Sequence, residues 1–336
     1  MDLPVRILAA PLREPVVFVD GLAEPGEAAV LELSHWPGNH TPVQFRHDLS
    51  SGAALRFAQL DEARRAELTR GASAVANDHF DTDGCLALFV LSQPELALAR
   101  RGAILDAAAA GDFFQWPTDR ALAIDAIVSG LSHAPGSPLG AGPEGEDDLA
   151  RWNRALSFLL EHFPTLLDGD LTGFEPIFEP VLERAREDRS CLADARREEV
   201  ASADLTLWHF AKGAVTRPGL PGRHALFGTT SSDRSLLLAE TGDGTLARLV
   251  VSTRSWFDLE SPAPLPRPDL EAMARTLNEL EGTEQQEELA WRAQSSDGAS
   301  PELWFGTAEL DAFAEHNDAL APSRLSPDQV RAVLTR

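Results

Sequence analysis

The chain has 336 residues, of which 43% are hydrophobic and 24% are charged, with 24 glycines and 23 prolines. This composition is typical of a globular protein and excludes collagen-like, low-complexity and fully disordered chains. The sum of 29 basic and 53 acidic residues is a formal net charge of −24. Such a charge argues against binding duplex nucleic acid, where cationic side chains must replace condensed counterions, and against an anionic membrane surface.

The two cysteines, Cys85 and Cys191, are too few for a disulfide framework and fit a reducing compartment, although the pair would allow one bridge. The amino terminus shows no basic leader followed by an apolar core. No uninterrupted apolar run approaches the roughly 20 residues that a membrane helix needs. We therefore expect a cytoplasmic protein; its oligomeric state does not follow from the sequence.

Residues 1–135 predict an α/β domain, because short apolar runs alternate with helical patterns. The predicted strands are Pro15–Val19, Ala29–Leu33, Ala53–Phe57 and Ser73–Asn77. The predicted helices are Asp61–Arg70, Cys85–Arg101 with an interruption at Pro94, Gly102–Asp112 and Asp119–Leu131. Two prolines and a glycine make the segment from Ser34 to Pro42 an irregular loop.

Residues 136–204 predict a linker and a helical connector, with a helix over Asp147–Leu167 and one or two solvated helices over Pro176–Asp204. Residues 205–336 predict a smaller α+β domain. Its predicted strands are Leu205–Phe210, His224–Phe227, Ser235–Glu240 and Ala247–Thr253, with a hairpin turn at Thr241–Gly244. Its predicted helices begin at the cap Asp269 and at Ser326–Pro327.

The segment from Asp78 to Asp83 holds three carboxylates and an imidazole between a predicted strand and a predicted helix. Open α/β sheets bind ligands at the carboxyl ends of their strands. In an extended chain, side chains two residues apart point the same way, so His79, Asp81 and Asp83 would share one face. One imidazole and two carboxylates suit Mn²⁺, Fe²⁺, Zn²⁺ or Mg²⁺, and such an ion can lower the pKa of a bound water.

A structural alternative stays open for the same residues. Asp and Gly form turns, and Asp81-Thr82-Asp83-Gly84 would cap the following helix without any ion. A calcium loop is excluded, because no glutamate stands at the far position of the twelve-residue pattern.

The sequence from His79 to Gly84, followed by an apolar helix, resembles the first motif of the DHH phosphoesterases. That superfamily includes exonucleases, oligoribonucleases and manganese pyrophosphatases, and its members bind a pair of divalent metals through a histidine and two aspartates. The resemblance implies a metal-dependent attack of water on a phosphate ester or anhydride, with manganese as the first choice of metal. It also implies a helical linker and a smaller second domain. The chain contains no Asp-His-His triplet, and overall it resembles an uncharacterised bacterial family.

Four further residues are candidates for the same site. Asp112 follows an alanine-rich helix and is a candidate metal ligand, with a helix-end turn as the alternative. His35 and His40 flank the irregular loop and would hold a phosphate or a metal, and Asn39 is a similar candidate. We assign His35, Asn39 and His40 to substrate binding, with plain solvation as the alternative.

Two other residues have separate interpretations. Cys85 stands where a helix is expected to begin, and a helix start lowers the pKa of a thiol, so a thiolate enzyme is one hypothesis. Trp36 would stack on a ring of a ligand, or would simply pack.

The leading hypothesis is a divalent-metal-dependent hydrolase that acts on a small phosphorylated compound, with His79, Asp81, Asp83 and Asp112 as metal ligands. The second hypothesis is a non-catalytic binding or scaffold protein descended from such an enzyme, which the absence of an Asp-His-His triplet favours.

Overall fold

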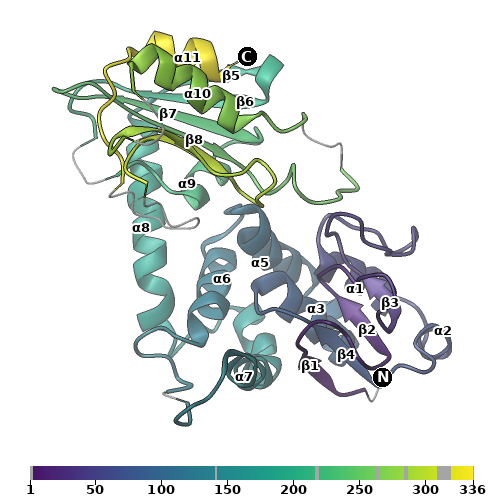
Figure 1. Ribbon diagram of the computed structural model, residues 1–336. Coiled ribbons are helices and arrows are strands. Elements are labelled where there is room, and N and C mark those ends of the chain that lie inside the picture. The colour runs from purple at the N-terminus through teal and green to yellow at the C-terminus, as the bar shows by residue number, and fades with distance from the viewer. Residues whose placement is uncertain are drawn as a thin grey trace. The chain divides into compact units, whose positions relative to one another are not determined.

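Figure 1 shows a computed structural model of the chain, which describes residues 3–140, 142–215, 219–261, 265–283, 287–308 and 319–335. The chain divides into two compact units. Unit 1 comprises Met1–Glu183 and Phe257–Pro262, and unit 2 comprises Arg184–Trp256 and Ala263–Arg336. The predicted α/β fold class is confirmed, whereas the predicted division after residues 135 and 204 stays a prediction. Among the described residues, no helix has the length and apolar character to cross a membrane.

Unit 1 contains a four-stranded sheet in the order β1-β4-β2-β3, in which every neighbouring pair is parallel. The strands are β1 (Val5–Ile7), β2 (Val16–Val19), β3 (Ala29–Leu33) and β4 (Ala74–Asn77). Three of them were predicted, and β1 is too short to give a sequence signal. Since all four strands run the same way, their carboxyl ends lie at one edge of the sheet.

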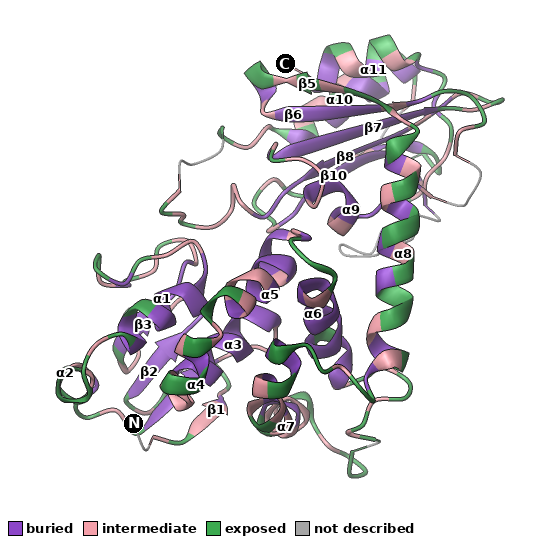
Figure 2. Cartoon of the chain, turned by 180° about the vertical axis from the view of Figure 1, so that it is seen from behind, coloured by how far each residue is buried: buried purple, intermediate pink, exposed green. Residues whose placement is uncertain are grey.

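The helices of unit 1 cover one face of this sheet (Figure 1), apart from α2, which has no buried residue. They are α1 (Ser50–Ala58), α2 (Glu62–Leu68), α3 (Thr82–Ser92), α4 (Pro94–Ala99), α5 (Arg101–Phe113), α6 (Asp119–Leu131), α7 (Asp148–Asp168) and the first half of α8 (Glu175–Ala193). Val17 and Val19 of β2 and Val75 of β4 pack into the helical core, while Phe18 and Ala76 pack on the other face against Leu12 and Ala23. Burial on both faces explains why these strands are continuous apolar runs (Figure 2).

The prediction of a strand over Ala53–Phe57 is wrong, because these residues lie within helix α1. Short apolar runs do not distinguish a strand from a buried helix by their periodicity. Here a distant residue contributes to the choice: the carboxylate of Asp83 accepts hydrogen bonds from the first amides of α1, at Ser50 and Ser51. These amides have no partner within their own helix.

Unit 2 contains a six-stranded mixed sheet in the order β5-β6-β7-β8-β10-β9, in which only β6 and β7 are parallel neighbours. The strands are β5 (Arg196–Val200), β6 (Leu205–Phe210), β7 (Arg234–Glu240), β8 (Thr245–Val251), β9 (Ala290–Ala293) and β10 (Glu302–Gly306). The helical elements are the second half of α8, a 3₁₀ turn at Ala201–Ala203, α9 (Arg223–Phe227), α10 (Leu270–Glu281) and α11 (Pro327–Leu334). Helices α10 and α11 share one apolar core with the sheet.

Two predictions for this unit are wrong. The segment His224–Phe227 belongs to helix α9, and the predicted helical stretch Pro176–Asp204 ends in strand β5 after α8. Strand β5 is charged because it is an edge strand with one neighbour, β6, so its pattern resembles that of a solvated helix. The hairpin between β7 and β8 and the caps at Asp269 and Ser326 are confirmed.

Candidate metal centre

The carboxyl ends of β2, β3 and β4 place acidic and imidazole side chains at one edge of the unit 1 sheet. Asp20 follows β2 directly, His35 stands two residues after β3, and the segment Asp78–Asp83 follows β4. These residues are up to 63 positions apart in the chain, and the parallel pairing of β2 with both β3 and β4 brings them together. The site therefore occupies the edge at which open α/β sheets bind ligands.

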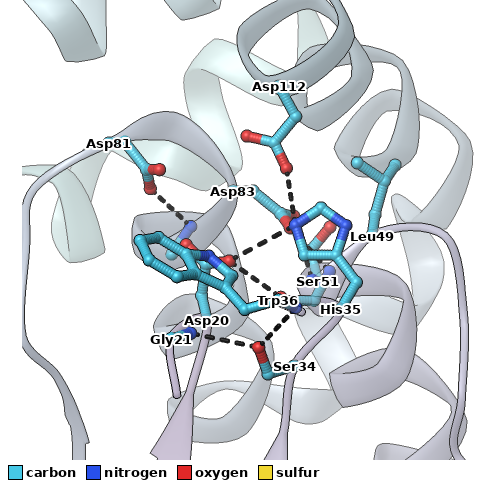
Figure 3. A network of polar contacts seen from close by, with 12 residues as sticks. Asp20, Gly21, Ser34, His35, Trp36, Leu49, Ser51, Asp81, Asp83 and Asp112 are labelled. Carbon is cyan, nitrogen blue, oxygen red and sulfur yellow. Dashed lines mark hydrogen bonds and ion pairs between the residues drawn. The ribbon is translucent and has the colours of Figure 1, made fainter. Parts of the chain in front are cut away.

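Four residues at this edge, Asp20, His35, Asp83 and Asp112, form a first cluster that we call group A. One potential ligand atom from each lies within 4.8 Å of the others. The Nε2 atom of His35 is 3.1 Å from Asp112 Oδ2, 3.6 Å from Asp20 Oδ1 and 3.8 Å from Asp83 Oδ2 (Figure 3). One imidazole and three carboxylates thus face a common point.

A second cluster, group B, consists of Asp20, His79 and Asp81, whose potential ligand atoms also lie within 4.8 Å of one another. His79 Nε2 is 3.0 Å from Asp81 Oδ2 and 3.2 Å from Asp20 Oδ2. Asp20 therefore belongs to both groups: its Oδ1 atom faces His35 and its Oδ2 atom faces His79. The predicted ligands His79, Asp81 and Asp83 divide between the groups, with only Asp83 in group A.

The local backbone holds Asp20 in this shared position. Its φ angle is 51°, in the left-handed region, which is uncommon for a residue other than glycine and is best tolerated by Asp and Asn. Its side chain is 1% exposed, and its Oδ1 atom accepts a hydrogen bond of 2.8 Å from Ser50 Oγ. Uncommon backbone conformations at buried polar residues are frequent in functional sites.

The carboxylate of Asp83 lies at the amino terminus of α1. Its Oδ2 atom accepts a hydrogen bond of 2.6 Å from the Ser50 amide, and its Oδ1 atom accepts one of 2.9 Å from the Ser51 amide. The positive end of the helix dipole stabilises the negative charge of this group. An ion in group A would use the remaining lone pairs of Asp83, and α1 would fix their direction.

Asp81 serves two roles at once. Its Oδ1 atom accepts a hydrogen bond of 2.8 Å from the Gly84 amide and so caps helix α3, as the structural alternative predicted. Its Oδ2 atom faces group B. Gly84 is required here, since a Cβ atom would lie 1.9 Å from Asn77 Nδ2 and 2.9 Å from Asp20 Oδ2. Capping and metal binding are therefore compatible at this turn.

The orientation of His35 tests whether group A fits a cation. Its Nδ1 atom is 2.5 Å from the carbonyl oxygen of Asp48, which can only accept, so Nδ1 carries the proton. Burial lowers the pKa of His35, against the opposing charge of Asp83, so the ring is neutral and Nε2 presents a lone pair. That lone pair faces carboxylate oxygens and has no hydrogen-bond partner among the described residues. A cation between these atoms would satisfy the arrangement, and metal-binding histidines typically donate their other N–H in this way.

The carboxylates are too crowded to ionise together without a counter-charge. Burial, with the nearby charge of Asp81, raises the pKa of Asp20 to about 7. Burial and the charge of Asp83 raise the pKa of Asp112 well above its ordinary value. Burial opposes ionisation of Asp81 as well, but His79 outweighs it and lowers the pKa of Asp81. Divalent cations would remove this mutual repulsion, so the donor set fits them.

His79 is the cationic partner within the cluster. Burial lowers its pKa, but the charge of Asp81 and hydrogen bonds to Asp20 and Asp78 outweigh burial, so its pKa lies well above the ordinary value. Its Nδ1 atom is 2.9 Å from Asp78 Oδ1. Asp78 thus orients the ring of His79.

The other predicted site residues lie elsewhere on the loop after β3. Asn39 donates from its side-chain amide to the Trp36 carbonyl and accepts from the Thr41 amide, so it holds the loop together. The side chain of His40 is 70% exposed and lies 3.5 Å from Glu32. Neither residue contributes to the contacts of groups A and B, and their role in substrate binding stays a prediction.

Asp20, the residue common to both groups, was not among the predicted site residues. One signal could have found it: Asp20-Gly21 follows a buried strand, as Asp78 does. Cys85, in contrast, is a poor nucleophile, because burial and the charge of Asp81 raise the pKa of its thiol well above the ordinary value.

A family model matches almost the whole chain, over residues 8–336. This chain belongs to DUF6687, a family of unknown function. No curated protein matches the chain. Among solved structures, the pGpG-specific phosphodiesterase PggH from Vibrio cholerae is similar at 11% sequence identity and a TM-score of 0.34, with 87% of this chain and 79% of that chain covered. A match of this quality carries no argument about activity.

Proposed function

We propose that this protein is a divalent-metal-dependent hydrolase with a two-ion centre, acting on a phosphate ester of a small compound. The position of Asp20 carries the proposal, because its two carboxylate oxygens face two different sets of ligand atoms. A shared carboxylate is what a pair of closely spaced cations requires. Two-ion centres of this kind are common in phosphatases and nucleases.

The proposed ligands of the first ion are His35, Asp83, Asp112 and Asp20, and those of the second ion are His79, Asp81 and Asp20. Mixed imidazole and carboxylate donors suit manganese, which we propose as the metal, with zinc, iron and magnesium as alternatives. When bound, such ions lower the pKa of water and neutralise charge that develops on phosphate oxygens.

Backbone groups of the chain would position the metal ligands. The amides of Ser50 and Ser51 hold Asp83, the Gly84 amide holds Asp81, and the Asp48 carbonyl orients His35. Ligands held in this way would not have to rearrange during the reaction. Such preorganisation of charged and polar groups is the main source of electrostatic catalysis.

The substrate would enter on the side of group B. The side chains of His79 and Asp81 are 25% and 38% exposed, whereas those of Asp20, His35 and Asp83 are at most 1% exposed. Trp36, whose ring centroid is 5.2 Å from that of His79, stands at this side and would contact the organic part of the substrate. We propose a small substrate because the charge of −24 repels a polynucleotide. Asn39 and His40, on the same loop, stay proposed substrate contacts.

The test combines metal content with turnover. Protein purified without chelators should hold about two divalent ions per chain, and it should release p-nitrophenol from bis-p-nitrophenyl phosphate. Asp83→Asn and Asp81→Asn should each remove one ion and reduce kcat by at least 100-fold. Asp106→Asn, on helix α5 but in neither group, is the matched control and should change neither quantity.

Two results would count against the proposal. Full metal content in both ligand variants would show that the ions bind elsewhere. Two bound ions without turnover of any phosphate ester would favour the alternative of a non-catalytic binding protein. Reconstitution of the metal-free protein with Mn²⁺, Zn²⁺, Fe²⁺ or Mg²⁺ in parallel would identify the metal.

A further inference from the structure

A short segment from the second half of the sequence belongs to unit 1. Between β8 and α10, the chain leaves unit 2 at Trp256, and residues from Phe257 onward are part of unit 1 until the chain resumes unit 2 at Ala263. We call residues 257–261 the strap. It lies more than 200 positions from His35 in the sequence, and nothing in its composition marks it as part of a site.

The strap contacts the ring and the backbone of His35. The ring of Phe257 stacks on the imidazole, with the centroids 3.8 Å apart and the planes 15° apart. Phe113, at the end of α5, meets both rings edge-on, at 6.1 Å from His35 and 5.9 Å from Phe257. The amide of Asp258 also donates a hydrogen bond of 2.8 Å to the His35 carbonyl oxygen.

The strap also holds the residue that orients the ring. The Ser261 amide donates a hydrogen bond of 2.8 Å to Asp48 Oδ1, and the Ser261 hydroxyl donates to Asp48 Oδ2. Burial raises the pKa of Asp48, but these hydrogen bonds and its other partners outweigh burial, so the pKa lies below its ordinary value. The carbonyl of the same Asp48 accepts from His35 Nδ1. Strap residues thus act on one face of the imidazole and on the partner of its Nδ1 atom.

Group B is held by other residues. Asp78 orients His79, and the Gly84 amide orients Asp81, and all of these belong to the turn after β4 and the start of α3. The two groups share Asp20 but depend on different supports. Loss of the strap contacts should therefore disturb the ligands of group A more than those of group B.

We propose that Phe257 and Ser261 are positioning residues that keep Nε2 of His35 aimed at group A, so that the ion of group A depends on the strap and the ion of group B does not. The inference rests on the proposed two-ion centre. An imidazole that rotates about its Cβ–Cγ bond turns the lone pair of Nε2 away from the carboxylates. Phe257 blocks that rotation by stacking, and Asp48 blocks it through Nδ1. Loss of such outer contacts typically weakens metal affinity by about 10- to 100-fold.

The test uses the full chain with Phe257→Ala, Ser261→Ala and the conservative variant Phe257→Tyr. Mn²⁺ binding is measured by equilibrium dialysis, and the magnetic coupling of the ion pair is measured by electron paramagnetic resonance. Phe257→Ala should weaken one of the two sites by about 10- to 100-fold, leave the other within about threefold, and replace the coupled signal with that of a single ion. Ser261→Ala should weaken the same site by a smaller factor. Phe257→Tyr keeps the stacked ring and should restore both ions.

Phe158→Ala is the matched control. Phe158 stacks on His162 in helix α7, with centroids 3.9 Å apart and planes 12° apart, and neither residue belongs to a metal group. This variant removes the same type of contact in the same unit and should leave both sites unchanged. Combining Phe257→Ala with Asp83→Asn should add nothing to the loss caused by Asp83→Asn, because both act on group A.

The outcomes separate the two proposals. Wild-type protein with fewer than two ions would overturn the two-ion centre and the inference with it. Wild-type protein with two ions, and a Phe257→Ala variant that binds both as tightly, would overturn the inference alone. Equal weakening of both sites by Phe257→Ala, or the same weakening by Phe158→Ala, would show general destabilisation and would also overturn it.

Discussion

Replacing the shared carboxylate by Asp20→Asn separates the function of the site from its cost to stability. Asparagine has nearly the same shape, can still accept a hydrogen bond from Ser50 Oγ, and tolerates the left-handed φ angle of 51°. The substitution therefore removes the charge and one ligand oxygen without disturbing the backbone. We expect loss of both ions and of turnover, since both groups use Asp20.

The same substitution should stabilise the metal-free protein. In the folded chain the pKa of Asp20 is about 7, compared with 3.8 ordinarily, so the folded protein holds this proton more strongly than the unfolded chain does. Stability then falls as the pH rises from about 4 to 7, because the unfolded chain ionises first. The raised pKa of Asp20 costs about 4 kcal/mol of stability at pH 8, somewhat under half of that at pH 5, and almost nothing at pH 3. Asparagine does not carry this cost.

Thermal unfolding in the presence of EDTA measures the effect. At pH 8 the melting temperature of Asp20→Asn should exceed that of the wild type by roughly 10 °C, and the difference should vanish near pH 3. Added Mn²⁺ should stabilise the wild type and leave the variant unchanged. Asp106→Asn should show neither effect. A variant that melts no higher than the wild type at pH 8, or that keeps two ions, would contradict this role of Asp20.

Three other expectations follow from the geometry. Gly84→Ala should abolish metal binding and cost about 1–3 kcal/mol of stability, because its Cβ atom would collide with Asn77 Nδ2. Gly102→Ala, whose Cβ atom would have nothing within 4 Å, should be neutral or slightly stabilising. Equal effects of the two variants in calorimetry and metal assays would contradict this. Mn²⁺ affinity should fall at least tenfold for each pH unit below 7, since Asp20 must lose its proton to bind an ion, and the raised pKa values of Asp112 and His79 steepen the dependence further. A flat dependence in titrations at pH 5.5, 6.5 and 7.5 would disagree. Cys85→Ser should retain turnover, and iodoacetamide should label the folded protein slowly; rapid inactivation by alkylation would instead support a thiol enzyme.

The local elements near the site follow from local patterns. The strand that ends at Val19 and the strand Ala29–Leu33 are continuous apolar runs that end at turn residues. Helix α6 has the predicted bounds Asp119–Leu131, with Thr118 as its N-cap. The acidic turn from Asp78 to Asp83 could also be recognised, because its residues are neighbours in the chain. The local pattern did not predict helix α1, whose amino terminus contacts Asp83, a residue more than 30 positions away.

An imidazole and several carboxylates after a buried strand, in a strongly acidic α/β chain, can be recognised from the residues alone, because composition, periodicity and caps act over a few residues. Which other side chains join them depends on how the strands and loops pack together. Asp20 and His35 reach the centre because β2 and β3 lie parallel to β4, and Phe257 reaches it because the chain places the strap in unit 1. Strand order and long-range docking depend on the packing of whole faces, so no short stretch of residues specifies them.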